Sequence, residues 1–245
     1  MKVCLRIYHV VLALLLVAAG VVIERVDFVD YCMVRENWEE ILRLAGQHVK
    51  LVAVSMALAT VTGVTIGVLF TRRWFRPAAG VIMYIVGLGQ TIPSLAILAL
   101  VMGVLGLGAK TAIFALYIYS VLPIARNTLA GITSVPPPMI DAARGMGMSP
   151  ARILVSVELP NAMRVILTGF RVALIINIGT AALAYLINAG GLGELIFTGI
   201  KLWKPEKQLA GTLPVIFLAL SADFLCGLLR YALIPRGLRL ADDEA

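Results

Sequence analysis

The sequence predicts an all-α polytopic membrane protein with about six transmembrane helices. Hydrophobic residues make up 60% of the 245 residues and charged residues only 14%, whereas a soluble domain is about half apolar and about one quarter charged. Several apolar runs approach 20 residues, the length at which a helix crosses the hydrocarbon core of a bilayer. These runs lack the alternation of a membrane-spanning strand, so we expect helices, which satisfy their own backbone hydrogen bonds in lipid.

Six segments are long and apolar enough to form these helices. They cover residues 8–23, 49–70, about 79–104, 111 to about 124, about 165–189 and about 209–233. The third segment contains Gly87, Gly89 and Pro93, which predict a broken helix. The first follows Lys2 and Arg6, so it is either a retained anchor or part of a signal peptide. The lack of a clean cleavage site favours the anchor.

The distribution of charge predicts that both termini are cytoplasmic. With the N-terminus inside, most of the 21 Lys and Arg residues fall on the cytoplasmic side, where such residues collect in membrane proteins. The short loop T-R-R-W-F-R-P at residues 71–77 is the clearest example. The net charge of +7 therefore reflects topology, and we expect the lipid bilayer and no nucleic acid as a partner.

Three regions are expected along the chain. Residues 1–45 form an N-terminal anchor and an extracytoplasmic segment, residues 46–236 form the transmembrane domain, and residues 237–245 form a cytoplasmic tail. The pattern E-N-W-E-E-I-L-R-L-A near Trp38 predicts a short amphipathic helix lying at the membrane interface.

No catalytic or metal-binding constellation is visible in the sequence. Cys4, Cys32 and Cys226 are far apart and form no CxxC pair. The segment G-L-G-A-K-T at residues 106–111 lacks the glycine that a phosphate-binding loop needs directly before its lysine. We expect a chain that is not an enzyme and that binds no metal or cofactor itself.

A polar interruption at about residues 126–164 lies between the fourth and fifth segments. Its three prolines at 136–138 cannot continue a helix, and we expect them to stiffen the chain there. Residues 141–146 then predict a short helix that ends at Gly147, which is free to adopt a positive φ. Ser149 and Pro150 predict the cap and first turn of a second short helix. We expect this helix to run to about Val157 and to stop before Pro160.

Small and charged residues in this loop predict a knob that contacts another protein. Ala142 and Ala143 are small enough for a second protein to approach closely. Asp141, Arg144 and Arg152 would supply polar contacts around them.

This loop resembles the signature of the type I, MetI-like permeases of ABC importers. The family pattern is E-A-A, three residues, G, nine residues and I-x-L-P, and the spacing here is the same at Asp141, Ala142, Ala143, Gly147, Val157, Leu159 and Pro160. The chain has Asp for Glu at the first position and Val for Ile near the end. In the family the loop docks on a cytoplasmic ATPase subunit, so Asp141 would contact an ATPase cation, with a reach one methylene shorter.

The resemblance implies several partners and a location. They are an ABC ATPase that uses the ATP, an extracytoplasmic solute-binding protein, and a second permease chain in a homodimer or heterodimer. The location would be the bacterial inner membrane. Residues 87–96, 122–132 and 189–200 resemble the osmoprotectant branch, which imports glycine betaine, choline or carnitine. Permeases for methionine and other amino acids share the fold and remain an alternative.

Polar residues inside the predicted spans are candidates for the translocation pathway. Gln90, Thr91, Pro93 and Ser94 interrupt the third span, and Asn177 and Thr180 lie within the fifth. Each either lines the path or bonds neighbouring helices. Asp223, in the sixth span, either pairs within the bundle or serves an ion-coupled secondary transporter. The glycine-rich residues 189–200 could form an outer gate, and Trp203 and Lys204 lie where a binding protein could dock.

Overall fold

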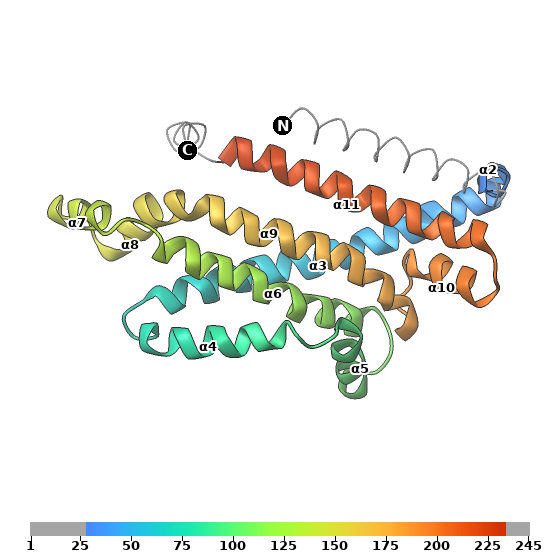
Figure 1. The fold of residues 1–245 in the computed structure, drawn as a ribbon, viewed down its shortest axis with the longest axis horizontal. Helices are drawn as coiled ribbons and strands as arrows, with labels where there is room; N and C mark the ends of the chain where they lie inside the picture. The colour runs from blue at the N-terminus through green and yellow to red at the C-terminus, as the bar shows by residue number, and fades with distance from the viewer. Residues whose placement is uncertain (1–27, 234–245) are drawn as a thin grey trace, which may run out of the picture.

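In the computed structural model, which describes residues 28–233, the chain is an elongated bundle of helices without strands in that range (Figure 1). The membrane-length elements are α3 (Arg35–Thr71), α6 (Ala109–Thr133), α9 (Leu159–Ala181) and α11 (Pro205–Leu233). The shorter helices are α2 (Phe28–Met33), α4 (Arg76–Gly89), α5 (Ser94–Leu105), α7 (Pro137–Gly145), α8 (Pro150–Ile153) and α10 (Gly193–Lys201). A π-helical segment, η1 (Leu154–Glu158), joins α8 to α9, and a 3₁₀ segment, η2 (Ala182–Ile187), follows α9.

Within residues 28–233 the predicted spans agree with the observed helices. Four helical stretches are long and apolar enough to cross a membrane, and α4 with α5 forms a fifth, bent by 95° at residues 90–93. This bend confirms the expected break in the third span. The first predicted span, residues 8–23, and the predicted tail, residues 237–245, lie outside the described residues.

The amphipathic segment near Trp38 is not the separate interfacial helix that the sequence predicted. It forms the first turns of α3, which runs unbroken from Arg35 and crosses the predicted domain boundary at residues 45–46. Ile41 and Leu44 are buried against Leu192, Leu195 and Ala210. This packing continues the buried face of the span, so the helix has no reason to turn along the membrane surface.

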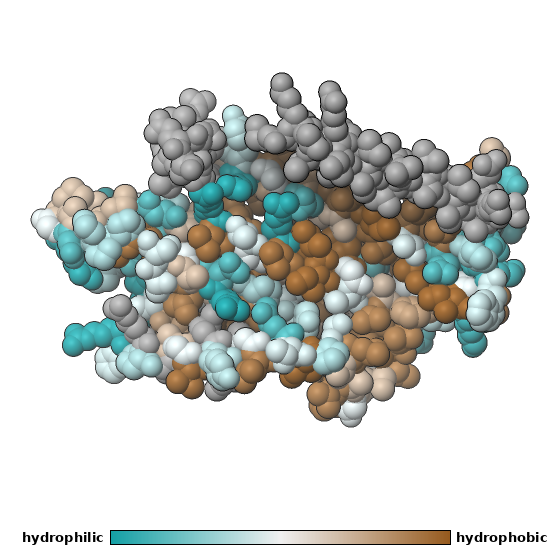
Figure 2. Space-filling view, viewed as in Figure 1, coloured by the Kyte–Doolittle hydropathy of each residue, from teal (hydrophilic) through white to brown (hydrophobic). Residues whose placement is uncertain are grey.

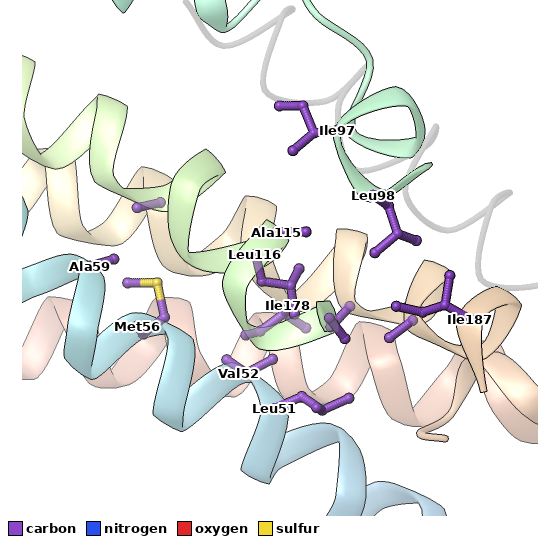
Figure 3. Close-up of a cluster of buried hydrophobic side chains, with 14 of the residues drawn as sticks. Leu51, Val52, Met56, Ala59, Ile97, Leu98, Ala115, Leu116, Ile178 and Ile187 are labelled. Carbon is purple, nitrogen blue, oxygen red and sulfur yellow. The ribbon is translucent and has the colours of Figure 1, made fainter. Parts of the chain in front are cut away.

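The largest core lies between α3, α5, α6 and the end of α9 (Figure 3). Val52 and Met56 on α3 point toward Leu116 on α6 and Ile178 on α9. Beyond this core, α6 packs closely against both neighbours, because glycines replace side chains at the crossings. A Cβ added at Gly67 or Gly169 would lie only 2.5 Å from a side-chain atom of α6. This three-helix bundle is the frame that carries the loop between α6 and α9.

Candidate functional site

The knob predicted between the fourth and fifth spans lies at one end of the bundle (Figure 1). Its first helix, α7, starts at Pro137 rather than at residue 141. Pro136 is the N-cap and the next two prolines occupy the first turn, where the missing N–H groups have no helical partner to lose. The three prolines therefore begin the helix, which corrects the expectation that they only stiffen its approach.

Gly147 ends α7 in the conformation that the sequence predicted. Its φ is +76°, and its N–H donates to the carbonyl of Arg144 at 2.9 Å. The N–H of Met148 reaches back to the carbonyl of Ala143 at 3.1 Å. This is the paired bonding of a Schellman C-cap, in which glycine is favoured at the left-handed position.

The two alanines of the motif have different environments. Ala142 is exposed, whereas Ala143 is only 1% exposed because α7 packs back on η1. Ala143 is thus part of the loop's own interior and offers no surface to a second protein, contrary to expectation. Asp141 and Arg144 are both exposed and form an ion pair of 3.2 Å across one helical turn. Because that pair is exposed, it is weak, and Asp141 can exchange its partner readily.

The sequence reasoning did not identify the exposed apolar side chains of α7 and η1. Met146 is 70% exposed and Met139 and Val155 are also exposed. Methionine adapts its shape to varied partners, so these side chains suit a detachable protein contact. The available signal was the presence of apolar residues inside a loop that is otherwise polar.

The second helix of the knob is continuous with the fifth span. Ser149 accepts a hydrogen bond from the N–H of Arg152 at 3.4 Å, and Pro150 occupies the first turn, as predicted. Pro160, however, does not stop the helix. Residues from Pro150 to Ile187 form one helical run of 38 residues, which includes Leu159 and Pro160 in the first turn of α9.

The π-helical segment η1 explains how the run passes Pro160. A proline ring clashes with the carbonyl four residues earlier in an α-helix and removes a donor. In η1 the helix widens, and the N–H of Leu159 bonds to the carbonyl of Leu154, five residues back. Asn161 donates its side-chain amide to the carbonyl of Val157 at 2.7 Å. The knob is therefore attached to the span by a continuous helix with one irregular turn.

An open cleft of about 910 Å³ lies behind α7. It brings together the C-terminal ends of α3 and α6 with the knob, and its lining includes Thr71, Arg72, Arg73, Thr133, Asp141, Arg144 and Glu158. The basic turn after α3 and the knob thus share one end of the bundle. The distribution of charge predicts that both segments lie on the same side of the membrane, and they lie at the same end of the bundle.

The candidate pathway residues divide into an exposed group and a buried one. Thr91 and Pro93 are exposed and Gln90 is half-buried at the bend between α4 and α5. Ser94 and Thr180 line one small cavity of about 20 Å³ between α5, α6, the end of α9 and η2, together with Tyr119.

Asn177 does not belong to that group. It is 1% exposed, and its amide donates to Ser120 on α6 at 2.7 Å and to Ser55 on α3 at 3.0 Å. It therefore ties three helices together, which favours the helix-bonding role, one of the two that the sequence left open.

Asp223 is paired with a cation on the neighbouring helix. Its two carboxylate oxygens accept from Nε and Nη2 of Arg171 at 2.5 and 2.7 Å. This two-point geometry fixes the carboxylate, so the pairing role is the one the structure supports. Arg171 is a residue of α9.

Other polar side chains on the spans face outward. Arg126 on α6 and Thr168 on α9 are both exposed, and hydrophilic residues are interspersed over these two helices in Figure 2. Polar groups inside a membrane usually face the protein interior or water. This face is therefore a better candidate for contact with a path or a second chain than for contact with lipid.

The glycine-rich segment at the other end folds into a turn and α10. Gly190 and Gly191 have positive φ, and the N–H of Gly191 donates to Gln47 at 3.1 Å. Trp203 follows α10 in a left-handed conformation, with φ of +54°, and is 92% exposed. Within the described residues, no group of three or more metal-binding side chains is present.

Comparison with known proteins identifies the family. Residues 63–236 match the family described as the binding-protein-dependent transport system inner membrane component. The chain is 41% identical over 207 residues to a carnitine transport permease of Listeria monocytogenes, covering 84% of this chain and 94% of that protein. It is 45% identical over 186 residues to an osmoprotectant import permease of Salmonella typhimurium, covering 76% and 79%.

A solved structure gives the same fold. The MetNI methionine ABC transporter, in an inward-facing conformation, matches with a TM-score of 0.73 at 22% identity, covering 83% of this chain and all of that one. This likeness confirms the predicted MetI-like all-helical fold. The chain belongs to the family of binding-protein-dependent transport system inner membrane components, the permease subunits of ABC transporters.

Proposed function

We propose that this permease forms the translocation path of an importer for glycine betaine, choline, carnitine or a similar quaternary ammonium solute. Support for the solute class comes from relatives named as carnitine, choline and osmoprotectant permeases at 41% to 45% identity. The methionine transporter shares the fold at only 22% identity, so it does not favour an amino-acid substrate.

The observation that carries the mechanism is the exposed knob on the end of a continuous helix. The turn at Gly147 presents Asp141, Ala142 and Met146 at the surface. A separate ATPase subunit would bind this surface and use the ATP, with no cofactor held by this chain. Its closure on ATP would then move the helical run that begins at Pro150.

The remaining partners and the orientation follow from this proposal. A second permease chain, identical or related, would cover the face that carries Arg126 and Thr168. The path would pass the bend at Gln90, Thr91 and Pro93 and the small cavity of Ser94 and Thr180. The knob and both termini would be cytoplasmic in the bacterial inner membrane, and a solute-binding protein would dock at the opposite end.

Matched substitutions at two glycines test the coupling role. Gly147 and Gly145 are both exposed, and no atom lies within 4 Å of a Cβ added at either. Only Gly147 has a positive φ, which a β-branched residue adopts with strain. We expect Gly147→Val to reduce ATPase binding and ATP-dependent uptake about tenfold, given roughly 1–3 kcal/mol of strain at such a position.

The assay uses the full complex with its ATPase and binding protein in proteoliposomes. Labelled glycine betaine, choline, carnitine and methionine are supplied in separate arms. Gly145→Val should behave as wild type. Undiminished uptake by Gly147→Val would refute the coupling role, and selective uptake of methionine would refute the solute class. Transport that ignores ATP but collapses with an uncoupler would support the ion-coupled alternative, although Asp223 is already paired with Arg171.

A further inference from the structure

A sheltered ion pair holds the base of α9 against the end of α3. Nη2 of Arg72 lies 2.5 Å from Oε2 of Glu158. The Glu158 side chain is 11% exposed and that of Arg72 is 31% exposed. Nε of Arg72 also donates to the hydroxyl of Thr71 at 2.9 Å. The guanidinium is thus fixed at two points, and a carboxylate this buried requires its partner.

The position of Glu158 gives the pair its importance. Glu158 is the last residue of η1, directly between the knob and the first turn of α9. Arg72 is the C-cap of α3 and the first residue of the basic turn that leads to α4. An apolar cluster beside the pair, containing Ile132, Ala162 and Ile166, also receives Val68 from α3 and Leu159 from α9. The pair therefore lies where the knob's helix joins the three-helix bundle.

Because η1 is an irregular turn, a contact at Glu158 is needed to transmit a movement of the knob to the bundle. In η1 the hydrogen bonds span five residues instead of four, and Pro160 has no N–H to donate to the preceding turn. Segments of this kind bend more readily than an α-helix, and they occur often at functional sites. Without a contact at Glu158, a displacement of α7 could be lost by bending at η1.

We propose that Arg72 and Glu158 are positioning residues that transmit the displacement of the knob to α3. This inference rests on the proposed coupling function. With the pair intact, α3 and α9 move together when the ATPase moves α7. With the pair broken, the ATPase still binds the knob and hydrolyses ATP, but fewer cycles open the path.

Charge reversal distinguishes transmission from simple stability. Arg72→Glu, Glu158→Arg and the double variant are assembled with the ATPase and binding protein in proteoliposomes. Uptake of labelled glycine betaine and ATP hydrolysis are measured in the same vesicles. We expect each single variant to lose about tenfold in solute transported per ATP, an effect of the size seen along coupling networks. The double variant restores an attractive pair and should recover most of that ratio.

The control pair lies at the other end of the bundle. Arg35 and Glu39 form an exposed ion pair of 2.9 Å at the start of α3, and reversing it should leave transport per ATP unchanged. If a reversed single variant fails to assemble, Arg72→Gln and Glu158→Gln replace the reversals. Glutamine removes one charge of the pair without placing two like charges side by side.

Two results would overturn the inference. One is an unchanged transport ratio in the single variants, and the other is a double variant no better than either single. Failure of the proposed function gives a different result, because the wild-type complex itself would then take up none of the quaternary ammonium solutes.

Discussion

The α3–α6–α9 bundle and helix α4 are both apolar, but they are packed in opposite ways. At Gly67 and Gly169 an added Cβ would lie 2.5 Å from α6 atoms. At Gly80 and Gly87 on α4, no atom lies within 4 Å of the same addition. The difference shows that hydrophobicity identifies a span but does not reveal which spans form the rigid frame. The positions of small residues at helix crossings reveal which spans form that frame, since small residues permit the helix backbones to approach each other.

The same contrast separates two functional roles. The bundle carries the knob through the helical run from Pro150 to Ile187, so it must keep its shape while the knob is moved. The α4–α5 pair exposes large apolar side chains, including Tyr84, Leu100 and Val104. These side chains need a cover of lipid or of a second chain. Substitutions that fill the same space in both regions test this difference directly.

The largest expected effect is at Gly169 on α9. A Cβ there would lie 2.5 Å from Cβ of Asn127 and 2.9 Å from the carbonyl oxygen of Pro123. Neither neighbour can rotate away, so Gly169→Ala should destabilise the protein by about 3 kcal/mol, the upper part of the range for overpacking. Thermal unfolding of the purified protein in detergent measures the loss.

Gly179 provides the control on the same helix. It is exposed, and no atom lies within 4 Å of an added Cβ. Gly179→Ala should leave the unfolding temperature unchanged or slightly raised. Equal losses at both positions would show that α9 is not packed against α6 in this way.

A smaller effect is expected from Asn177, which bonds the bundle together. Asn177→Leu removes hydrogen bonds to Ser55 and Ser120 and should cost about 1 kcal/mol, as such bonds do within membranes. Thr180→Val is the matched control, because the Thr180 hydroxyl bonds only to carbonyls of its own helix. If Asn177→Leu changes the KM for solute but not the unfolding temperature, Asn177 lines the pathway and does not stabilise the bundle.

Features carried by local patterns could be predicted from the sequence. The length of each apolar run predicted the spans from α3 to α11, and the Gly147 C-cap and Ser149 N-cap followed from residue type and spacing. The prolines gave wrong helix limits. Pro136–Pro138 and Pro160 were interpreted as breakers. Pro137 and Pro138, however, occupy the first turn of α7, where a proline loses no bond, and Pro160 lies within a continuous run that passes through η1. The π-helical turn at Pro160 depends on backbone geometry that has no sequence pattern of its own.

Contacts between distant segments could not be predicted. Arg72 and Glu158 are 86 residues apart, and Arg171 and Asp223 are 52 apart. Pairing of Asp223 within the bundle was one of two expectations, but nothing in the sequence indicated a specific partner for any of these four residues. The cleft behind α7 is also formed by segments that meet only in the folded chain. Burial of Ala143 likewise depends on how α7 packs against η1.

The smallest expected effect on stability is at Gly87 on the loosely packed helix α4. Gly87 lies in the last turn of α4, and no atom lies within 4 Å of a Cβ added there. Because glycine in a helix costs about 0.5–1 kcal/mol relative to alanine, Gly87→Ala should stabilise the chain by about 0.5 kcal/mol. The same substitution thus has opposite signs at Gly169 and Gly87. A fall in unfolding temperature for Gly87→Ala, measured in detergent beside Gly169→Ala, would show that α4 is packed as closely as the bundle.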